Sequence, residues 1–191
     1  MNQITYRKLT EKDCEGMKDM DASQFIKRAW REVKGERKLV EINYLDPTWP
    51  GGFEDHYNCL KATIDKKGCA IGAFDLDQNQ MVGFITVEPE FFGERDKYVL
   101  LDQLYVSRPY RSQGIGKKLF TMAAEEARGW KADKFYIAAG SAEETIAFYF
   151  ALGCREAVEI NQEIYEEDPR DLQLEYDLRR GDHECTVSNE Q

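Results

Sequence analysis

The sequence predicts a single α/β domain with a mixed sheet. Short β-rich runs recur along the whole chain, and runs with helical spacing separate several of them. A chain of 191 residues, of which 42% are hydrophobic, is long enough to bury one substantial core. We expect the domain to cover residues 1–180 and a polar tail to follow over residues 181–191.

Local patterns predict the elements of the first half. Apolar and polar residues alternate in the first strand, and Thr10 followed by Asp13 marks the start of a short helix. Two β-rich runs around residues 34–37 predict a hairpin, and the prolines and glycines of 47–52 require a loop. The expected order is a strand at 4–9, a helix ending near 20, a hairpin of 25–33 and 38–45, a helix at 55–67 that Gly68 ends as its C′ residue, and a hairpin of 72–76 and 81–87.

The second half alternates strands with helices. The helix after residue 114 places Ile115, Leu119 and Met122 on one face. Ser141 and Glu144 form a capping-box pattern at the start of a later helix. The expected order is a strand at 97–106, a helix ending near 129, a strand at 135–139, a helix at 141–153, and two strands at 156–160 and 172–178.

Composition limits the function classes. Lys and Arg total 26 against 36 Asp and Glu, giving a net charge of −10, which argues against nucleic-acid binding. This charge is compatible with a cationic substrate and equally with plain solubility. The five cysteines are irregularly spaced, so we expect neither a disulfide framework nor a metal site. No apolar run has the length of a membrane span or of a signal peptide, so we expect a cytoplasmic protein without a membrane partner.

The stretch Arg111–Lys118, Arg-Ser-Gln-Gly-Ile-Gly-Lys-Lys, joins a β-rich run to a helix. Gly114 and Gly116 would let main-chain N–H groups approach a ligand closely. The first turn of a helix has unpaired N–H groups and the positive end of the helix dipole, both of which favour an anion. Residues 103–124 contain four Lys or Arg and no acid, which supports a bound diphosphate.

Spacing excludes two common phosphate loops. A dinucleotide fingerprint requires glycine at position 119, which is Leu, and a P-loop requires Ser or Thr at position 118, which is Lys. The remaining pattern, Arg-x-x-Gly-x-Gly after a strand, resembles the pyrophosphate loop of the GNAT superfamily of acetyl-CoA-dependent N-acyltransferases.

A second segment resembles the same superfamily. The run from Phe148 to Cys154 matches its Phe-Tyr-x-x-x-Gly-Phe pattern, with Cys154 in the last position, and Ala142 stands where the family often has Asn. The resemblance covers roughly residues 70–180 and is greatest to uncharacterised bacterial members. It implies a GNAT-like fold, with a mixed, mostly antiparallel sheet of about seven strands flanked by helices and with splayed central strands.

The resemblance also implies acetyl-CoA as cosubstrate. Main-chain groups of residues 103–106 would pair with the pantetheine arm, and one N–H would polarise the acetyl carbonyl. The residues expected to bind acetyl-CoA are Leu104, Tyr105, Val106, Arg111, Ser112, Gln113, Gly114, Ile115, Gly116, Lys117, Ser141, Thr145 and Phe148.

Catalytic candidates follow from the same comparison and from the residue types. Tyr149 matches the family's general acid, although an aromatic on a helix face also suits core packing. Glu88, Asp102 and Glu90 are candidates for the base; Asp102 interrupts an apolar strand, where an unpaired carboxylate is costly. His56 is expected on the surface.

The acceptor is expected to be a small amine or a peptide amine. Aromatic residues of the first part and of the loop after residue 87 could line its pocket; they are Trp30, Tyr44, Trp49, Phe53, Phe91 and Phe92. We therefore expect an N-acetyltransferase that acts by direct attack in a ternary complex. The alternatives are a non-catalytic acyl-CoA-binding module, or a transferase with another acyl group or an oxygen acceptor. A homodimer is left open.

Overall fold

The computed structural model describes residues 3–179, so the tail expected over residues 181–191 lies outside the described part. The strands are β1 (Ile4–Lys8), β2 (Gln24–Val33), β3 (Glu36–Asp46), β4 (Cys69–Asp75), β5 (Gln80–Val87), β6 (Tyr98–Val106), β7 (Lys134–Ala139), β8 (Arg155–Glu156) and β9 (Leu172–Asp177). The helices are η1 (Glu11–Asp19), α1 (Phe53–Asp65), η2 (Arg108–Tyr110), α2 (Ile115–Gly129), α3 (Glu143–Ala151) and α4 (Gln162–Glu167), where η marks a 3₁₀ helix.

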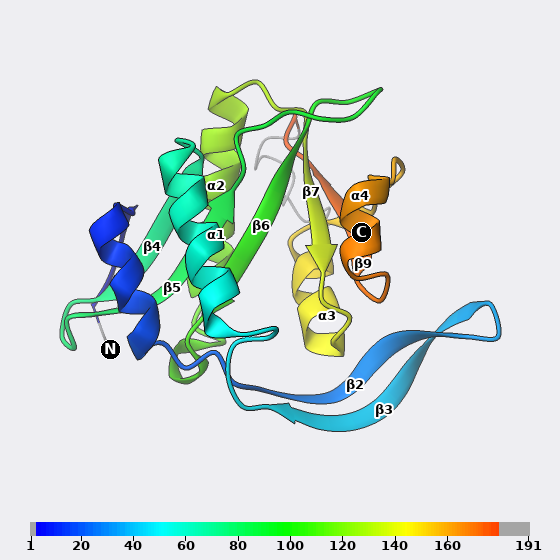
Figure 1. Ribbon diagram of the computed structural model, residues 1–191, viewed down its shortest axis with the longest axis horizontal. Helices are drawn as coiled ribbons and strands as arrows, with labels where there is room; N and C mark the ends of the chain where they lie inside the picture. The colour runs from blue at the N-terminus through cyan, green and yellow to red at the C-terminus, as the bar shows by residue number, and fades with distance from the viewer. Residues whose placement is uncertain (1–2, 180–191) are drawn as a thin grey trace, which may run out of the picture.

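Seven strands form one mixed sheet (Figure 1). Their order is β1-β4-β5-β6-β7-β9-β8, and every neighbouring pair is antiparallel except β6 with β7, which is parallel. The predicted mixed, mostly antiparallel sheet of about seven strands flanked by helices is therefore confirmed.

Apolar residues cover both faces of this sheet, with α1 in front and α2 behind in Figure 1. Leu119, Ala123 and Ala127 recur every fourth residue on α2 and are fully buried in one core. Met17 of η1 and Leu60 of α1 are buried in a second core around Phe84. The central strands are thus buried on both sides, which fixes the framework of the site.

Strands β2 and β3 form a separate antiparallel ribbon, and the predicted hairpin is confirmed. Its turn residues Lys34 and Gly35 both have positive φ, 54° and 79°, as a two-residue hairpin turn requires. The ribbon runs past the start of α3 (Figure 1), where Ala29 bridges to Ala142 and Trp30 N donates to the Ser141 carbonyl at 2.8 Å. The start of α3 therefore holds the ribbon against the domain.

The two parallel central strands separate along their length. β6 pairs with β7 only through residues 98–100, although it pairs with β5 as far as Val106. In Figure 1 the two strands begin together at the top and diverge downwards. We call the opening between residues 101–106 of β6 and the end of β7 the wedge. The predicted splay of the central strands is confirmed.

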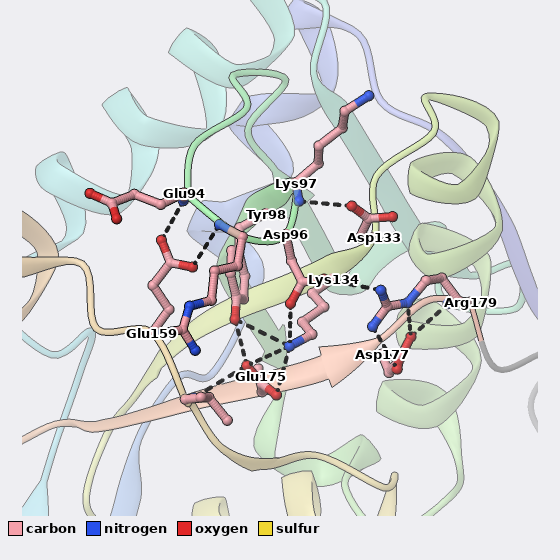
Figure 2. Close-up of polar contacts among 12 residues, drawn as sticks. Glu94, Asp96, Lys97, Tyr98, Asp133, Lys134, Glu159, Glu175, Asp177 and Arg179 are labelled. Atoms are coloured by element: carbon pink, nitrogen blue, oxygen red, sulfur yellow. Dashed lines mark hydrogen bonds and ion pairs between the residues drawn. The ribbon is translucent and has the colours of Figure 1, made fainter.

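A buried polar network closes the narrow end of the wedge (Figure 2). Lys134 and Glu175 are 4% and 0% exposed, and Lys134 Nζ lies 3.1 Å from Glu175 Oε1 and 2.7 Å from Asp96 Oδ2. The Tyr98 hydroxyl donates to Glu175 Oε2 at 2.6 Å. Burial alone would lower the pKa of Lys134, but the hydrogen bonds to Asp96 and Glu175 together raise it by more. The net pKa is therefore raised, and the amine stays charged. The network links the starts of β6 and β7 to β9.

Two local predictions were wrong. The strand expected at 156–160 is reduced to β8, and α4 follows it, capped by Asn161 Oδ1, which accepts from Ile164 N at 3.2 Å. Gly68 was expected in the left-handed conformation at a helix end, but Lys67 adopts it, with φ 60°. Gly68 is needed for space, because a Cβ there would lie 2.7 Å from Thr63 Cγ2.

Candidate active site

The loop between β6 and α2 has the backbone of an anion-binding turn. Ser112 and Gly114 have φ of 61° and 81°, and a Cβ on Gly114 would meet nothing within 4 Å. Glycine is thus favoured here by the left-handed backbone, and the space in front of α2 stays open. The first bond of the helix runs from Lys118 N to Gly114 O at 3.0 Å. The N–H groups of residues 115–117 precede it and are directed out of the helix end.

The glycine at position 116 is required for helix packing, whereas the sequence suggested that it makes room for a ligand. A Cβ on Gly116 would lie 3.2 Å from Cζ of Phe148, so the missing side chain lets α3 pack closely on the first turn of α2. Phe148, expected to bind the cofactor, is half-buried and lies against this turn. The sequence motif therefore combines one glycine for backbone conformation with one for helix packing.

The Arg111 guanidinium binds main-chain carbonyls of the protein. Its Nε donates to Val106 O at 2.9 Å, its Nη1 to Ser23 O at 2.9 Å and its Nη2 to Ala22 O at 3.4 Å. We expected a phosphate contact, but these bonds instead fix the loop to the segment that leads into β2. Arg108 N strengthens the link by donating to the carbonyl of Asp21 at 2.8 Å.

The other loop residues differ in what they can offer a ligand. Ser112, Gln113 and Lys117 are exposed, and Gln113 Nε2 donates to the Pro109 carbonyl at 3.1 Å. Ile115 is 2% exposed, with its side chain in the core, so only its main chain is available. The loop and the first turn of α2 thus offer main-chain N–H groups and the exposed amine of Lys117.

One edge of β6 faces the wedge, and its main chain is predicted to hold the pantetheine arm. Leu104, Tyr105 and Val106 are half-buried and pair with β5 on their other side only. Thr86 pairs with Gln103 and Val87 with Leu101, so the residue between them is a β-bulge. That residue is Asp102.

The bulge presents the Asp102 carboxyl as a titratable group. Within residues 3–179 no hydrogen bond or ion pair is made to this carboxyl. Asp102 is exposed by surface area, yet surrounding protein removes much of its hydration and raises its pKa to about 6. Glu88 and Glu167 also raise the pKa, while His56 and Lys66 lower it. A carboxyl with this pKa is a suitable base near neutral pH.

Glu88 is already engaged by α1. Its Oε1 accepts from Thr63 Oγ1 at 2.5 Å, and its Oε2 lies 2.9 Å from Lys66 Nζ. Lys66 also lies 3.5 Å from Glu90, which is exposed. These bonds make Glu88 an anchor for α1, and they leave Asp102 as the more available base.

His56 was expected on the surface, and this expectation was wrong. Its ring is half-buried between Trp49 and Tyr105, with Nδ1 2.8 Å from Gln103 Oε1. Nε2 lies 2.7 Å from the Pro50 carbonyl. The helical spacing of α1 could not reveal this contact, because Gln103 lies 47 residues away along the chain.

Tyr149 lies on α3 with its ring in the core. It is 7% exposed and packs edge-on to Phe120 and Phe148. Burial raises the pKa of its hydroxyl, and Cys154 and Tyr105 raise it further. The phenol therefore keeps its proton at neutral pH. Its helix, α3, packs through Phe148 on the first turn of α2, beside the glycine loop.

Ser141 was predicted to cap α3, and this prediction was wrong. The helix begins at Glu143 with Ala142 in the N-cap position, and no side chain caps it. Ser141 Oγ instead accepts from Nη1 of Arg31 at 2.5 Å. Thr145 lies half-buried on the next turn.

The aromatic residues expected around the acceptor do not form one pocket. Trp49 and Phe53 pack together in the core under α1, with the Trp49 ring centroid 4.9 Å from that of Tyr105. Phe92 stacks on Tyr98 at the narrow end of the wedge. Tyr44 and Phe91 are exposed, and Trp30 lines a pocket under the ribbon.

The wedge brings together a main-chain anion site, an open strand edge, a carboxyl that titrates near neutrality and a protonated phenol. These groups can hold a phosphorylated ligand with an amide-bearing arm, accept a proton from one reactant and donate one to another. Residues 3–179 contain no group of three or more His, Cys, Asp or Glu placed to hold a metal ion. None of the described helices is long and apolar enough to span a membrane.

Residues 37–154 match the acetyltransferase (GNAT) family. The protein is therefore an acyltransferase. Because the match covers more than half of the chain and includes β6, the glycine loop and all of α3, the chain belongs to the GNAT family of acetyltransferases. A search of curated protein sequences finds no match.

Solved structures share the fold at low sequence identity. Nourseothricin acetyltransferase matches with a TM-score of 0.68 and 18% identity, over 92% of this chain and 98% of that one. A Bacillus anthracis protein assigned as a streptothricin acetyltransferase, in complex with acetyl coenzyme A, matches with a TM-score of 0.67 and 16% identity, over 91% and 96%. The Escherichia coli ribosomal-protein-S18-alanine N-acetyltransferase matches with a TM-score of 0.57 and 13% identity, over 95% and 98%.

Proposed function

We propose that the protein transfers an acetyl group from acetyl-CoA to a primary amine by direct attack in a ternary complex. The observation that carries this proposal is the wedge between β6 and β7, which has the glycine turn at its wide end and Asp102 on its edge. Family membership supports it, and so do the similar folds that bind coenzyme A or its acetyl ester.

The described residues fit coenzyme A. The N–H groups of residues 115–117 and the Lys117 amine would hold the diphosphate, in the space that a side chain on Gly114 would fill. The free edge of β6 from Leu104 to Val106 would pair with the amides of the pantetheine arm. Arg111 would act indirectly, because its guanidinium bonds hold the loop in place.

Acetyl-CoA supplies the acetyl group as a thioester. Asp102 would accept a proton from the amine, directly or through a water, and the amine nitrogen would bond to the acetyl carbon as the carbon–sulfur bond breaks. A main-chain N–H of β6 would stabilise the negative charge on the acetyl oxygen. Tyr149 would donate its phenolic proton to the departing sulfur. Asp102 then loses its proton to solvent and Tyr149 regains one, so the charges balance.

The test measures thiol release from acetyl-CoA with amines of several classes: polyamines, aminoglycosides, amino acids and lysine-containing peptides. Mass spectrometry identifies the acetylated atom. We expect at least one N-acetylated product, and a parallel series of hydroxyl analogues should give none. Tight binding of acetyl-CoA without acetylation of any amine, or acetylation of oxygen alone, would contradict the proposal.

A further inference from the structure

A pocket of about 610 Å³ lies between the ribbon and the segment that runs from β8 to β9. Its volume is typical of sites for small molecules. Trp30 and Arg31 line it from β2, and Tyr165 and Asp171 line it from the opposite side. The pocket is separate from the glycine loop.

The pocket adjoins the wide end of the wedge. Leu172, the next residue after Asp171, pairs with Ala139, the last residue of β7. Burial raises the pKa of Tyr105 on β6, and the carboxyls of Asp102 and Asp171 raise it further. Asp102 thus lies on the β6 side of the wedge and Asp171 beside the end of β7, on its other side. A molecule in the pocket could extend past Tyr105 towards Asp102.

Arg31 is the arginine of this pocket whose charge is available to a ligand. Arg37 is paired with Glu156 at 2.7 Å and Arg170 with Asp168 at 2.7 Å. Arg31 is half-buried, and its Nη1 donates to the Trp30 carbonyl at 2.8 Å and to Ser141 Oγ at 2.5 Å. Across residues 3–179 no carboxylate forms an ion pair with it. These bonds fix the guanidinium while Nε and Nη2 can still donate to a carboxylate.

Asp171 supplies the opposite charge. Arg170 binds Asp168 through two bonds, of 2.9 and 2.7 Å, and in the described part of the chain the Asp171 carboxyl has no hydrogen-bond partner. Burial and the neighbouring Asp168 raise its pKa to about 6, while Arg170 and Arg31 lower it. Asp171 is thus a half-buried carboxylate close to a fixed guanidinium, and an ammonium ligand would compensate its charge.

We propose that this pocket binds the α-amino carboxylate group of a free diamino acid, whose side-chain amine extends into the wedge and is acetylated. Arg31 binds the carboxylate, Asp171 binds the α-ammonium, and Trp30 contacts the aliphatic chain. The inference rests on the proposed function and narrows its acceptor class. A purely cationic acceptor such as a polyamine would place one of its charges beside Arg31, which disfavours it.

Four amines distinguish the contact to the carboxylate from the contact to the α-ammonium. L-Lysine has both groups, L-lysinamide lacks the carboxylate, 6-aminohexanoate lacks the α-amine, and pentylamine lacks both. We expect kcat/KM for lysine to exceed that for lysinamide and that for 6-aminohexanoate by about tenfold or more each, because each lost contact is a charge-assisted hydrogen bond. Calorimetry of the same compounds with the protein saturated with coenzyme A measures the contacts without chemistry.

Three variants assign the contacts to residues. Arg31→Gln should remove the preference for lysine over lysinamide, and Asp171→Asn should remove the preference for lysine over 6-aminohexanoate. Lys27→Gln removes an exposed cation from the same strand, outside the pocket, and should leave both preferences unchanged. Thermal melting checks that each variant is folded.

Each outcome decides between the two proposals. Equal rates for the four amines, or preferences that persist in both pocket variants, overturn the head-group site and leave the N-acetyltransferase assignment intact. The same conclusion holds if none of the four is acetylated while another class of amine is. If no amine of any class is acetylated, the proposed function fails as well.

Discussion

Nδ1 of His56 lies 2.8 Å from Oε1 of Gln103, and Nε2 of the same ring lies 2.7 Å from the carbonyl oxygen of Pro50. Gln103 Nε2 donates to the His56 carbonyl at 3.3 Å, which leaves Oε1 as the amide atom that faces the ring. Both ring nitrogens therefore lie within hydrogen-bond distance of an oxygen atom, so the ring is held in one orientation. His56 favours the ionised form of Asp102, whose pKa it lowers.

Replacing His56 by Gln should move the pH dependence of the reaction. His56 lowers the pKa of Asp102, so its loss raises that pKa, and the acidic limb of kcat/KM shifts to higher pH. We expect activity at pH 6 to fall about two- to fivefold and activity at pH 9 to change little. Glu88→Gln is the matched variant of opposite sign, because Glu88 raises the pKa of Asp102. A limb that stays in place in both variants would show that Asp102 is not the titrating group.

Asp102→Asn should lower activity and raise stability. Loss of the base is expected to reduce kcat by about 10²–10³-fold and to remove the acidic limb near pH 6. The folded protein binds this proton more tightly than the unfolded chain, whose carboxyl titrates near about 3.9, so the free energy of unfolding falls as pH rises through this interval. The variant should therefore melt above wild type at pH 8 and level with it at pH 4. A variant that is less stable at pH 8 would contradict the desolvation of this carboxyl.

Tyr149→Phe should reduce turnover without weakening cofactor binding. Its raised pKa keeps the phenol protonated, so removal of the hydroxyl removes a proton donor, and we expect kcat to fall about 10²-fold. The Kd for acetyl-CoA should stay within about twofold by calorimetry. Tyr57→Phe is the control, because the Tyr57 hydroxyl on α1 donates to Glu15 Oε1 of η1 at 2.8 Å, outside the wedge, and its loss should affect stability alone. Normal turnover in Tyr149→Phe would exclude this residue as the acid.

The two glycines of the loop should respond differently. Gly114→Glu places a side chain and a negative charge in the open space before α2, so coenzyme A affinity should fall at least about 100-fold, while strain at φ 81° costs roughly 1 kcal/mol. Gly116→Ala presses on Phe148 and should lower the unfolding free energy by about 1–2 kcal/mol. Melting without ligand and calorimetry with coenzyme A measure both effects. Undiminished affinity in Gly114→Glu would rule out the loop as the phosphate site.

Local patterns predicted most of the framework. Strands 4–9 and 97–106, the ribbon hairpin and the helix after the glycine loop follow from alternation, turn residues and helical spacing, which depend on neighbours along the chain. The splay followed from the family resemblance. α4 was missed, although Asn161 three residues before Ile164 is a readable cap signal.

The sequence predicted which types of residue form the site better than it predicted which residues contact one another. A carboxylate inside an apolar strand singled out Asp102, but the bulge that exposes it arises from register with β5. Nothing near Glu88 in the sequence shows that Thr63 and Lys66 bind it, and nothing near Arg111 shows that the Ser23 carbonyl accepts a hydrogen bond from it. Such contacts join segments that only the folded chain brings together.

The point at which β6 meets β7 has a consequence for donor selectivity. In the proposed binding mode the diphosphate lies at the wide end, so the acyl group points towards Leu100, the last β6 residue paired with β7. Asp102 lies two residues before that barrier, and at about 3.3 Å per strand residue the remaining depth is roughly 7 Å. Propionyl-CoA should be used nearly as well as acetyl-CoA, and hexanoyl-CoA hardly at all; equal rates along such a homologous series would show that the strand junction does not limit chain length.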